Sequence, residues 1–331
     1  MSSTRGSTRA SATIEESMTA HTSSIPHLTD DLSTPPLTLW QMGWLRFRRH
    51  KMALAGVVIL ILLFVFSFGG MVFYSEQEAN FTDTSLRLLP PSVQHPFGTD
   101  TIGRDILART IYGGQISLFI GIISVVIETL LGILVGALAG YYGGWVDSLL
   151  MRITEALLNI PTIFLLLVMA KFFGNEIPEI EIGGRVFSGS VIVIVVIIGA
   201  TSWMYLARIV RAEFLSLKEN EFVLAARATG TSNAQIIFLH ILPNTIAPII
   251  VSSTLSVANA ILSEAYISFL GLGVQPPTAT WGNMLDSSAN YLDSAPWLWF
   301  FPGMLILLTV LSINFLGDGL RDALDPRSRT V

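Results

Sequence analysis

The chain has 331 residues, of which 51% are apolar and 13% are charged, and its formal net charge is −5. Soluble globular domains carry about 25% charged residues, so this composition excludes an ordinary cytosolic enzyme, disorder and a collagen-like fibre. The absence of cysteine excludes disulfide bonds, thiol catalysis and a Cys-ligated metal. A mean hydropathy of +0.62 predicts a polytopic membrane protein, and the mild charge gives no sign of nucleic-acid binding.

The N-terminal segment, residues 1–39, is rich in Ser and Thr and has no apolar periodicity. We expect a disordered cytoplasmic tail there, and no signal peptide, because the first apolar run begins only at residue 52. The following residues, 40–51, combine Trp40 and Trp44 with a basic cluster. This combination predicts an interfacial helix in front of the first membrane span.

Six windows are long and apolar enough to span a membrane, which takes about 20 residues. They are residues 52–74, 115–140, 156–173, 186–207, 245–270 and 297–317. We expect α-helices, because an open sheet leaves backbone groups without hydrogen bonds in lipid. The predicted fold class is therefore all-α, with six transmembrane helices.

The Lys and Arg residues orient these spans. With the N-terminus inside, they concentrate in the inner segments, so the positive-inside rule favours both termini in the cytoplasm. The predicted organisation is a tail over 1–39, an interfacial helix and first span over 40–74, an extracytoplasmic segment over 75–114, a five-helix core over 115–317 that contains an inner loop at 208–244, and a cytoplasmic C-terminus over 318–331.

The inner loop 208–244 has the signals of two short helices with a break between them. Asn220 is a candidate N-cap with Glu221 at the positive end of the first helix, and Gly230 is a candidate C′ residue. Ser232 and Gln235 form a capping-box pattern that restarts a helix.

Each short helix also has a predicted apolar face. The first face consists of Phe222, Ala225, Ala226 and Thr229, and the second of Ile236, Ile237, His240 and Ile241, before Pro243 ends the helix. On this pattern alone, a loop that packs on its own bundle and a helix that docks on a partner remain equally open.

Four blocks of sequence resemble one family. The first comprises Ala225, Ala226, Gly230 and residues 240–243, HILP, which resemble the EAA motif of ATP-binding-cassette importer permeases. The others are residues 95–105, residues 264–284 and residues 316–327. Taken together in chain order, the four blocks resemble the C-type permease subunit of dipeptide and oligopeptide (peptide/nickel) importers over residues 40–329. One position departs from the family pattern, because Leu224 stands where the usual glutamate would be.

The resemblance implies a type I ABC importer permease fold in the cytoplasmic membrane of a prokaryote. It also implies a B-type permease subunit as heterodimer partner, two ATPase subunits that bind ATP and Mg, and an extracytoplasmic binding protein that delivers the peptide. The loop would then be the coupling helix that contacts an ATPase. Its candidate residues are Glu221, Phe222, Leu224, Ala225, Ala226, Arg227, Gly230, His240 and Pro243.

The chain lacks the motif of an ATP site of its own. A P-loop needs Gly-Lys followed by Ser or Thr, and none of Lys51, Lys171 and Lys218 follows a glycine. We therefore expect a transport subunit without catalytic residues or cofactor, driven by ATPases on other chains. His240 and the other histidines show no metal-ligand spacing.

Two carboxylates fall within predicted spans, where a charge is costly unless it is paired or faces water. For Glu128, a position on the translocation path and a structural hydrogen bond to a neighbouring helix both remain open. For Glu264, helix packing or a gate is favoured over substrate contact.

Two other classes compete with the importer permease. A secondary transporter or channel that works alone would explain six spans and an intramembrane glutamate, but not the long inner loop. A membrane-embedded enzyme lacks a nucleophile–base motif. Within the importer class the substrate stays open, and a nickel chelate or glutathione is an alternative to a peptide.

Overall fold

The structure is a computed structural model that describes residues 39–174, 176–182 and 185–325. The predicted tail, except for Leu39, and the last residues of the predicted cytoplasmic C-terminus lie outside the described residues. The chain divides into two compact units, residues 1–42 and residues 43–331. The packing described below is that of the second unit.

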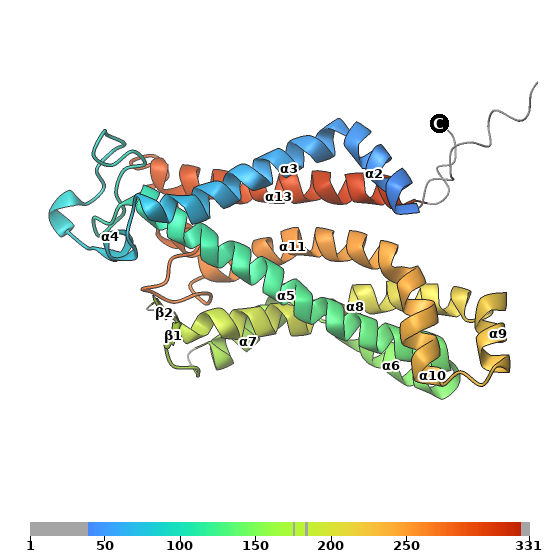
Figure 1. The fold of residues 1–331 in the computed structure, drawn as a ribbon. Helices are drawn as coiled ribbons and strands as arrows, with labels where there is room; N and C mark the ends of the chain where they lie inside the picture. Colours follow the sequence, from blue (N-terminus) through green and yellow to red (C-terminus); the bar gives the residue numbers. More distant parts are fainter. Residues whose placement is uncertain (1–38, 175, 183–184, 326–331) are drawn as a thin grey trace, which may run out of the picture. The chain divides into compact units, whose positions relative to one another are not determined.

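Membrane-spanning helices dominate the described part of the chain. Five helices there are long and apolar enough to cross a membrane: Lys51–Val72, Ile106–Tyr142, Gly189–Leu217, Asn233–Phe269 and Trp297–Leu324 (Figure 1). A sixth crossing results if α6 (Gly144–Leu158) and α7 (Thr162–Phe173), which meet at an angle of 84°, count as one. The prediction of an all-α multi-pass membrane protein is confirmed, and every predicted window overlaps one of these helices.

The long helices carry the labels of Figure 1. The first span consists of α3 (Lys51–Phe64), a π-helical turn (Val65–Gly69) and a 3-10 turn (Gly70–Val72). The second is α5 (Ile106–Tyr142) and the fourth is α8 (Gly189–Leu217). The fifth consists of α10 (Asn233–Gln235), a π-helical turn (Ile236–Ile241), a 3-10 turn (Leu242–Thr245) and α11 (Ile246–Phe269), and the last is α13 (Trp297–Leu324).

The shorter elements lie between the spans. They are α2 (Leu39–Arg49), α4 (Glu76–Asn80), a 3-10 turn (Thr84–Leu86), a hairpin of β1 (Ile180–Ile182) and β2 (Arg185–Phe187), α9 (Glu221–Ala228), α12 (Asn283–Asp286) and a 3-10 turn (Ser287–Tyr291). The two strands are antiparallel, with Ile180 opposite Phe187. Within the described residues, this hairpin supplies the two β-strands of an otherwise helical fold. The helix predicted over 40–51 is present as α2, and its interfacial position stays a prediction.

Several helix ends differ from the predicted boundaries. The second span starts at Ile106 rather than 115, because the Asp105 carboxylate accepts a hydrogen bond from the backbone N of Ala108 at 2.8 Å and caps the helix. The fourth span continues to Leu217, into the predicted loop. Residues 144–155, which lie between two of the predicted windows, are helical and belong to α6. The predicted windows contain only the apolar part of each helix. The helices themselves continue into polar turns on either side of that part.

Pro243 does not end its helix, contrary to the prediction. The chain stays helical from Asn233 to Phe269 by changing from a π-helical to a 3-10 turn around the proline. Proline lacks a donor N–H, so nearby carbonyl groups need other partners. The Asn244 Nδ2 donates to the His240 carbonyl at 2.7 Å and the Thr245 Oγ1 donates to the Leu242 carbonyl at 2.8 Å.

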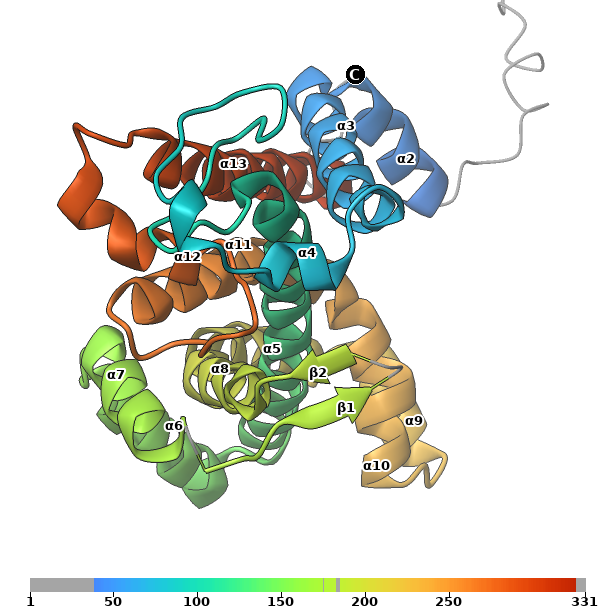
Figure 2. The same cartoon turned by 90° about the vertical axis from the view of Figure 1, so that its left-hand side faces the viewer.

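Helix α5 lies centrally and contacts both α8 and α11, whereas α3 pairs with α13 (Figure 2). The contact between α5 and α8 is close because three glycines one turn apart face it. A Cβ at Gly132 would lie 2.9 Å from the Leu206 side chain, one at Gly136 would lie 2.5 Å from the Ala207 carbonyl, and one at Gly140 would lie 2.5 Å from the Phe214 Cβ. Small residues at every fourth position let two membrane helices approach closely, so α5 and α8 pack as one unit.

Candidate functional site

Helix α9, from the predicted coupling segment, presents most of its side chains to the surface. Val223 is fully buried and Ala226 nearly so, in an apolar cluster with Tyr141 of α5 and Phe214 of α8. The large apolar side chains of Phe222 and Leu224 are 40% and 47% exposed. The other exposed predicted residues are Glu221, Ala225, Arg227 and Gly230. The exposed side of the helix is therefore apolar with flanking charges.

The predicted face of α9 includes both buried and exposed residues. Val223 and Ala226 form the buried side, whereas Phe222 and Ala225 are exposed. In a helix of only two turns, the spacing of the predicted face and the spacing of Val223 and Ala226 both fit a helical period. The position of α9 over the ends of α5 and α8 decides which side chains are buried. In the next segment three residues of the predicted apolar face are buried: Ile236, Ile237 and Ile241. His240 beside them is half-buried, and Pro243 is exposed.

The break between the two short helices has the predicted ends. The Gly230 N donates to the Arg227 carbonyl at 3.0 Å and the Thr231 N donates to the Ala226 carbonyl at 3.1 Å, which is a Schellman motif. Gly230 has φ +80°, a conformation that favours glycine. Ser232 and Gln235 form the predicted capping box, and Asn220 is the N-cap residue of α9 without a side-chain hydrogen bond.

One residue of the loop's surroundings was missed by the sequence analysis. The Tyr141 hydroxyl donates to the Asn233 Oδ1 at 2.7 Å, and the Arg227 guanidinium lies 5.4 Å from the centre of the Tyr141 ring. Tyr141 belongs to α5, far from the loop in sequence. A tyrosine near a helix end has many roles, so nothing in the pattern indicated this contact.

A polar face runs along α11, and it too was missed. Its residues follow one another at three and four positions, with Asn259 and Tyr266 exposed and the three serines half-buried: Ser252, Ser256, Asn259, Ser263 and Tyr266. An amide exposed to hydrocarbon in the middle of a span would lack hydrogen-bond partners. This face therefore meets water or polar groups of another chain, and its helical spacing was the available signal.

Glu128 lies behind this face. Its carboxylate belongs to α5, is 4% exposed and accepts a hydrogen bond from the Ser256 Oγ at 2.6 Å. The neighbouring Thr129 and Ser253 hydroxyls are 2.8 Å apart. Glu128 thus joins α5 to the polar face of α11 through a hydrogen bond. A position on the translocation path and a structural role both stay predictions.

Glu264 is fully buried at the other end of α11. Its carboxylate accepts hydrogen bonds from the Ser268 Oγ at 2.7 Å and the Ser117 Oγ at 3.3 Å. The Ser117 hydroxyl also accepts from the backbone N of Trp281 at 3.1 Å, and the buried Trp281 ring donates to the Thr110 carbonyl at 2.9 Å. Glu264 therefore ties α11, α5 and the segment after α11 together.

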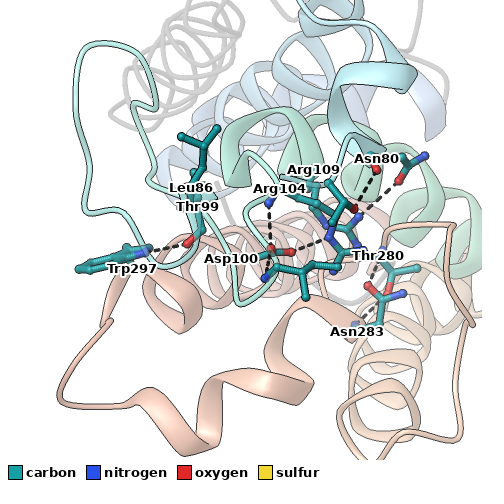
Figure 3. A network of polar contacts seen from close by, with 11 residues as sticks. Asn80, Leu86, Thr99, Asp100, Arg104, Arg109, Thr280, Asn283 and Trp297 are labelled. Atoms are coloured by element: carbon teal, nitrogen blue, oxygen red, sulfur yellow. Dashed lines mark hydrogen bonds and ion pairs between the residues drawn. The ribbon is translucent and has the colours of Figure 1, made fainter. Parts of the chain in front are cut away.

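Residues 86–105 form a second hydrogen-bonded structure near the start of α5 (Figure 3). The Asp100 carboxylate accepts from the Arg104 Nε at 2.6 Å and from the backbone N of Arg104 at 2.9 Å. The buried Thr99 carbonyl accepts from the Trp297 Nε1 at 3.1 Å, which attaches this segment to α13. A Cβ at Gly103, which has φ +84°, would overlap the Asp83 carbonyl, so the tight turn requires glycine.

The same network reaches α4 and the segment after α11. The guanidinium of Arg109, 4% exposed, donates to the Asn80 Oδ1 at 3.3 Å. Thr280 and Asn283 exchange two hydrogen bonds of 3.0 Å (Figure 3). At the start of α4, hydrogen bonds from the backbone and hydroxyl of Ser75 hold the pKa of Glu78 below its ordinary value. Two of the sequence blocks, 95–105 and 264–284, are thus held by internal polar contacts.

The described residues include no group of three or more His, Asp and Glu side chains placed to hold a metal ion. His240 therefore has no metal-binding neighbours within that part of the chain.

Two family models match the chain. Residues 132–330 match the family described as binding-protein-dependent transport system inner membrane component, and residues 38–91 match the N-terminal TM domain of oligopeptide transport permease C.

Similar proteins and a similar structure agree with these matches. The dipeptide transport system permease protein DppC of Alkalihalophilus pseudofirmus is 39% identical over 92% of this chain and 98% of its own. The oligopeptide transport system permease protein OppC of Bacillus subtilis is 37% identical over 91% of this chain and 93% of its own. A chain of the inward-facing MetNI methionine ABC transporter superposes with a TM-score of 0.50 at 19% identity, over 64% of this chain and 94% of that one. The last likeness concerns the fold, which is that of an ABC importer permease.

Proposed function

Since the chain belongs to the family of binding-protein-dependent transport system inner membrane components, we propose that it moves di- or oligopeptides inward across the cytoplasmic membrane. The peptide substrate is supported by relatives named as dipeptide and oligopeptide permeases that cover nearly the whole chain. The observation that carries the transport role is the polar face of α11, which provides hydrogen-bonding groups along a membrane span over about 21 Å.

The energy for transport comes from two ATPase subunits that bind ATP and Mg, and α9 is the surface that meets one of them. Its exposed Phe222 and Leu224 fit an apolar groove, and Val223 anchors the helix on its own bundle. A short helix joined rigidly to α8 and α11 transmits closure of the ATPases as a rigid-body shift. In this orientation α9 and both termini are cytoplasmic, in line with the basic residues of that side.

Two further partners complete the transporter. A B-type permease subunit faces the polar side of α11 and supplies the other half of the path, because one subunit leaves Asn259 exposed. An extracytoplasmic binding protein delivers the peptide at the end that carries α4 and α12.

Within the path, Glu128 orients Ser256 rather than contacting the peptide. Glutamine at this position keeps an acceptor for the Ser256 hydroxyl, so Glu128→Gln should leave peptide uptake and peptide preference unchanged. If uptake of peptides with a free amino terminus falls selectively in Glu128→Gln, the carboxylate contacts the substrate and this assignment is wrong.

Reconstitution tests the whole proposal. The chain is assembled with its partner permease, its ATPases and its binding protein in liposomes, and uptake of di-, tri- and pentapeptides, glutathione and a nickel chelate is measured with ATP or with ADP. We expect ATP-dependent uptake of peptides. Uptake of the chelate or glutathione without any peptide would contradict the proposed substrate, and uptake without ATPases would favour a transporter that works alone.

A further inference from the structure

The coupling loop is attached to a helix that it does not adjoin in sequence. Through the backbone, α9 connects only to α8 on one side and, through α10, to the fifth span on the other. Tyr141, the penultimate residue of α5, reaches both short helices of the loop. Its hydroxyl donates to the Asn233 Oδ1 of α10 at 2.7 Å, and its ring lies below the Arg227 guanidinium of α9 at 5.4 Å.

The surroundings of Tyr141 keep it in this position. The side chain is 7% exposed and packs in the apolar cluster that also holds Val223, Ala226 and Ile236. The preceding Gly140 allows the α8 backbone to approach, since a Cβ there would lie 2.8 Å from the Arg211 carbonyl. The ring is therefore enclosed by both short helices and by α8, so the side chain has little room to adopt another rotamer.

The contact matters because α5 carries Glu128. The two residues are 13 positions apart on one continuous helix, or about 20 Å along its axis. Glu128 in turn is hydrogen-bonded to Ser256 of the polar face. A displacement of α9 can thus reach the polar face through α5, in addition to the direct connection from the loop into α11.

We propose that Tyr141 is a positioning residue that fixes the coupling loop to α5, so that α5 moves with α9 when the ATPases close. This inference rests on the proposed role of α9 as the ATPase contact. It adds a specific residue, outside the loop, to the coupling machinery. Arg227 supplies a cation over the ring and Asn233 supplies an acceptor for the hydroxyl, so the two contacts hold α9 and α10 separately.

The test uses the complete reconstituted complex and measures peptide uptake per ATP hydrolysed, together with the amount of assembled complex. Tyr141→Leu removes both contacts, and we expect normal assembly, ATP hydrolysis and an uptake-to-ATP ratio reduced about three- to tenfold. Tyr141→Phe keeps the ring under Arg227 and should give a smaller reduction. Tyr142→Phe is the matched control, because it removes the hydroxyl of the next residue, which is 53% exposed, and keeps the edge contact of its ring with Tyr141, so it should keep the wild-type ratio.

A double-mutant cycle keeps the proposal testable if Tyr141→Leu fails to assemble. Tyr141→Phe and Asn233→Ala each remove the same hydrogen bond, so the double variant should lower the ratio no further than one single variant. Additive effects, or a wild-type ratio in Tyr141→Phe and in an assembled Tyr141→Leu, would overturn the role of Tyr141.

Failure of the underlying function would look different. If α9 were not the ATPase contact, changes within α9 such as Leu224→Glu would also leave the uptake-to-ATP ratio unchanged. A lowered ratio in Leu224→Glu beside a wild-type ratio in Tyr141→Leu and Tyr141→Phe would reject the link to α5 and retain the coupling helix.

Discussion

Two residues of the loop, Gly230 and Leu224, have local properties from which the effect of a substitution can be predicted. Gly230 has φ +80°, and a Cβ there would meet no atom within 4 Å, so any substitution acts through backbone strain rather than through a clash. The Leu224 side chain is 47% exposed. An exposed leucine at this place gains by burial against a partner rather than by a polar contact.

The first prediction at this scale concerns Gly230. Gly230→Ala should destabilise the loop conformation by about 1 kcal/mol, and Gly230→Pro should do more because it also removes the N–H that donates to Arg227. We expect Gly230→Pro to insert and assemble but to lose peptide uptake. Gly303→Ala in α13 is the control, since its Cβ also meets no atom within 4 Å but its φ is ordinary. Wild-type uptake in Gly230→Pro would refute the requirement.

The second prediction concerns Leu224. Leu224→Glu should weaken ATPase association and lower the ATPase activity that the loaded binding protein stimulates, because a carboxylate would be desolvated against an apolar groove. Leu224→Met keeps the apolar character and should behave as wild type. Co-purification of the ATPases and their stimulated activity give the answer, and unchanged values for Leu224→Glu would mean that this position contributes little.

At the scale of elements, α11 has two sides with different tasks. One side packs on α5, α8 and α13, and the other carries the polar face with Asn259 exposed. The segment before α11 changes from a π-helical to a 3-10 turn at Leu242, next to Pro243, so that the loop and the span remain one continuous helical segment. A helix with one packed side and one polar side is typical of a helix that lines a water-filled path.

The chain has no cysteine, which allows a direct test of the polar face. Single substitutions Ser252→Cys and Asn259→Cys should react with a membrane-impermeant maleimide in the assembled complex, and substrate should slow the reaction. Leu130→Cys on α5 is the control, because it exchanges an apolar side chain that is 65% exposed and should meet lipid or a partner. Labelling of Leu130→Cys but not of Asn259→Cys would contradict the proposed path.

At the scale of the whole described unit, buried polar groups hold the helices together at one end. Glu264 joins three segments through Ser117 and Ser268. Thr99 joins the segment before α5 to α13, and Arg109 joins α5 to α4 (Figure 3). In a membrane protein the apolar residues gain little by leaving lipid, so packing and internal hydrogen bonds decide the arrangement of helices.

Replacement of Glu264 should therefore affect stability. Glu264→Leu leaves the Ser117 and Ser268 hydroxyls without their acceptor and should cost about 2 to 4 kcal/mol, whereas Glu264→Gln keeps an acceptor and should cost less. Thermal unfolding of the purified complex measures the difference. An unchanged melting temperature for Glu264→Leu would show that this hydrogen-bonded cluster does not contribute.

The sequence by itself determined the class of the protein and its main parts. Long apolar windows required helices because lipid offers no hydrogen bonds to the backbone, and Gly230, Ser232 and Gln235 predicted the break between α9 and α10 because caps depend on local geometry. The family resemblance rested on blocks of residues whose structural roles, such as the partners of Glu264, could not be deduced from spacing.

Only the tertiary structure decided which of several equally periodic faces is buried. Val223 rather than Phe222 packs inward because α9 lies over the ends of α5 and α8, and Tyr141 meets Arg227 and Asn233 although some 90 residues separate them in the chain. Glu128 was identified from the sequence, but its partner Ser256 was not, since contacts between helices depend on their relative rotation. The low charge content predicted a membrane protein. The packing of the helices determined which partners the few polar side chains within the spans contact.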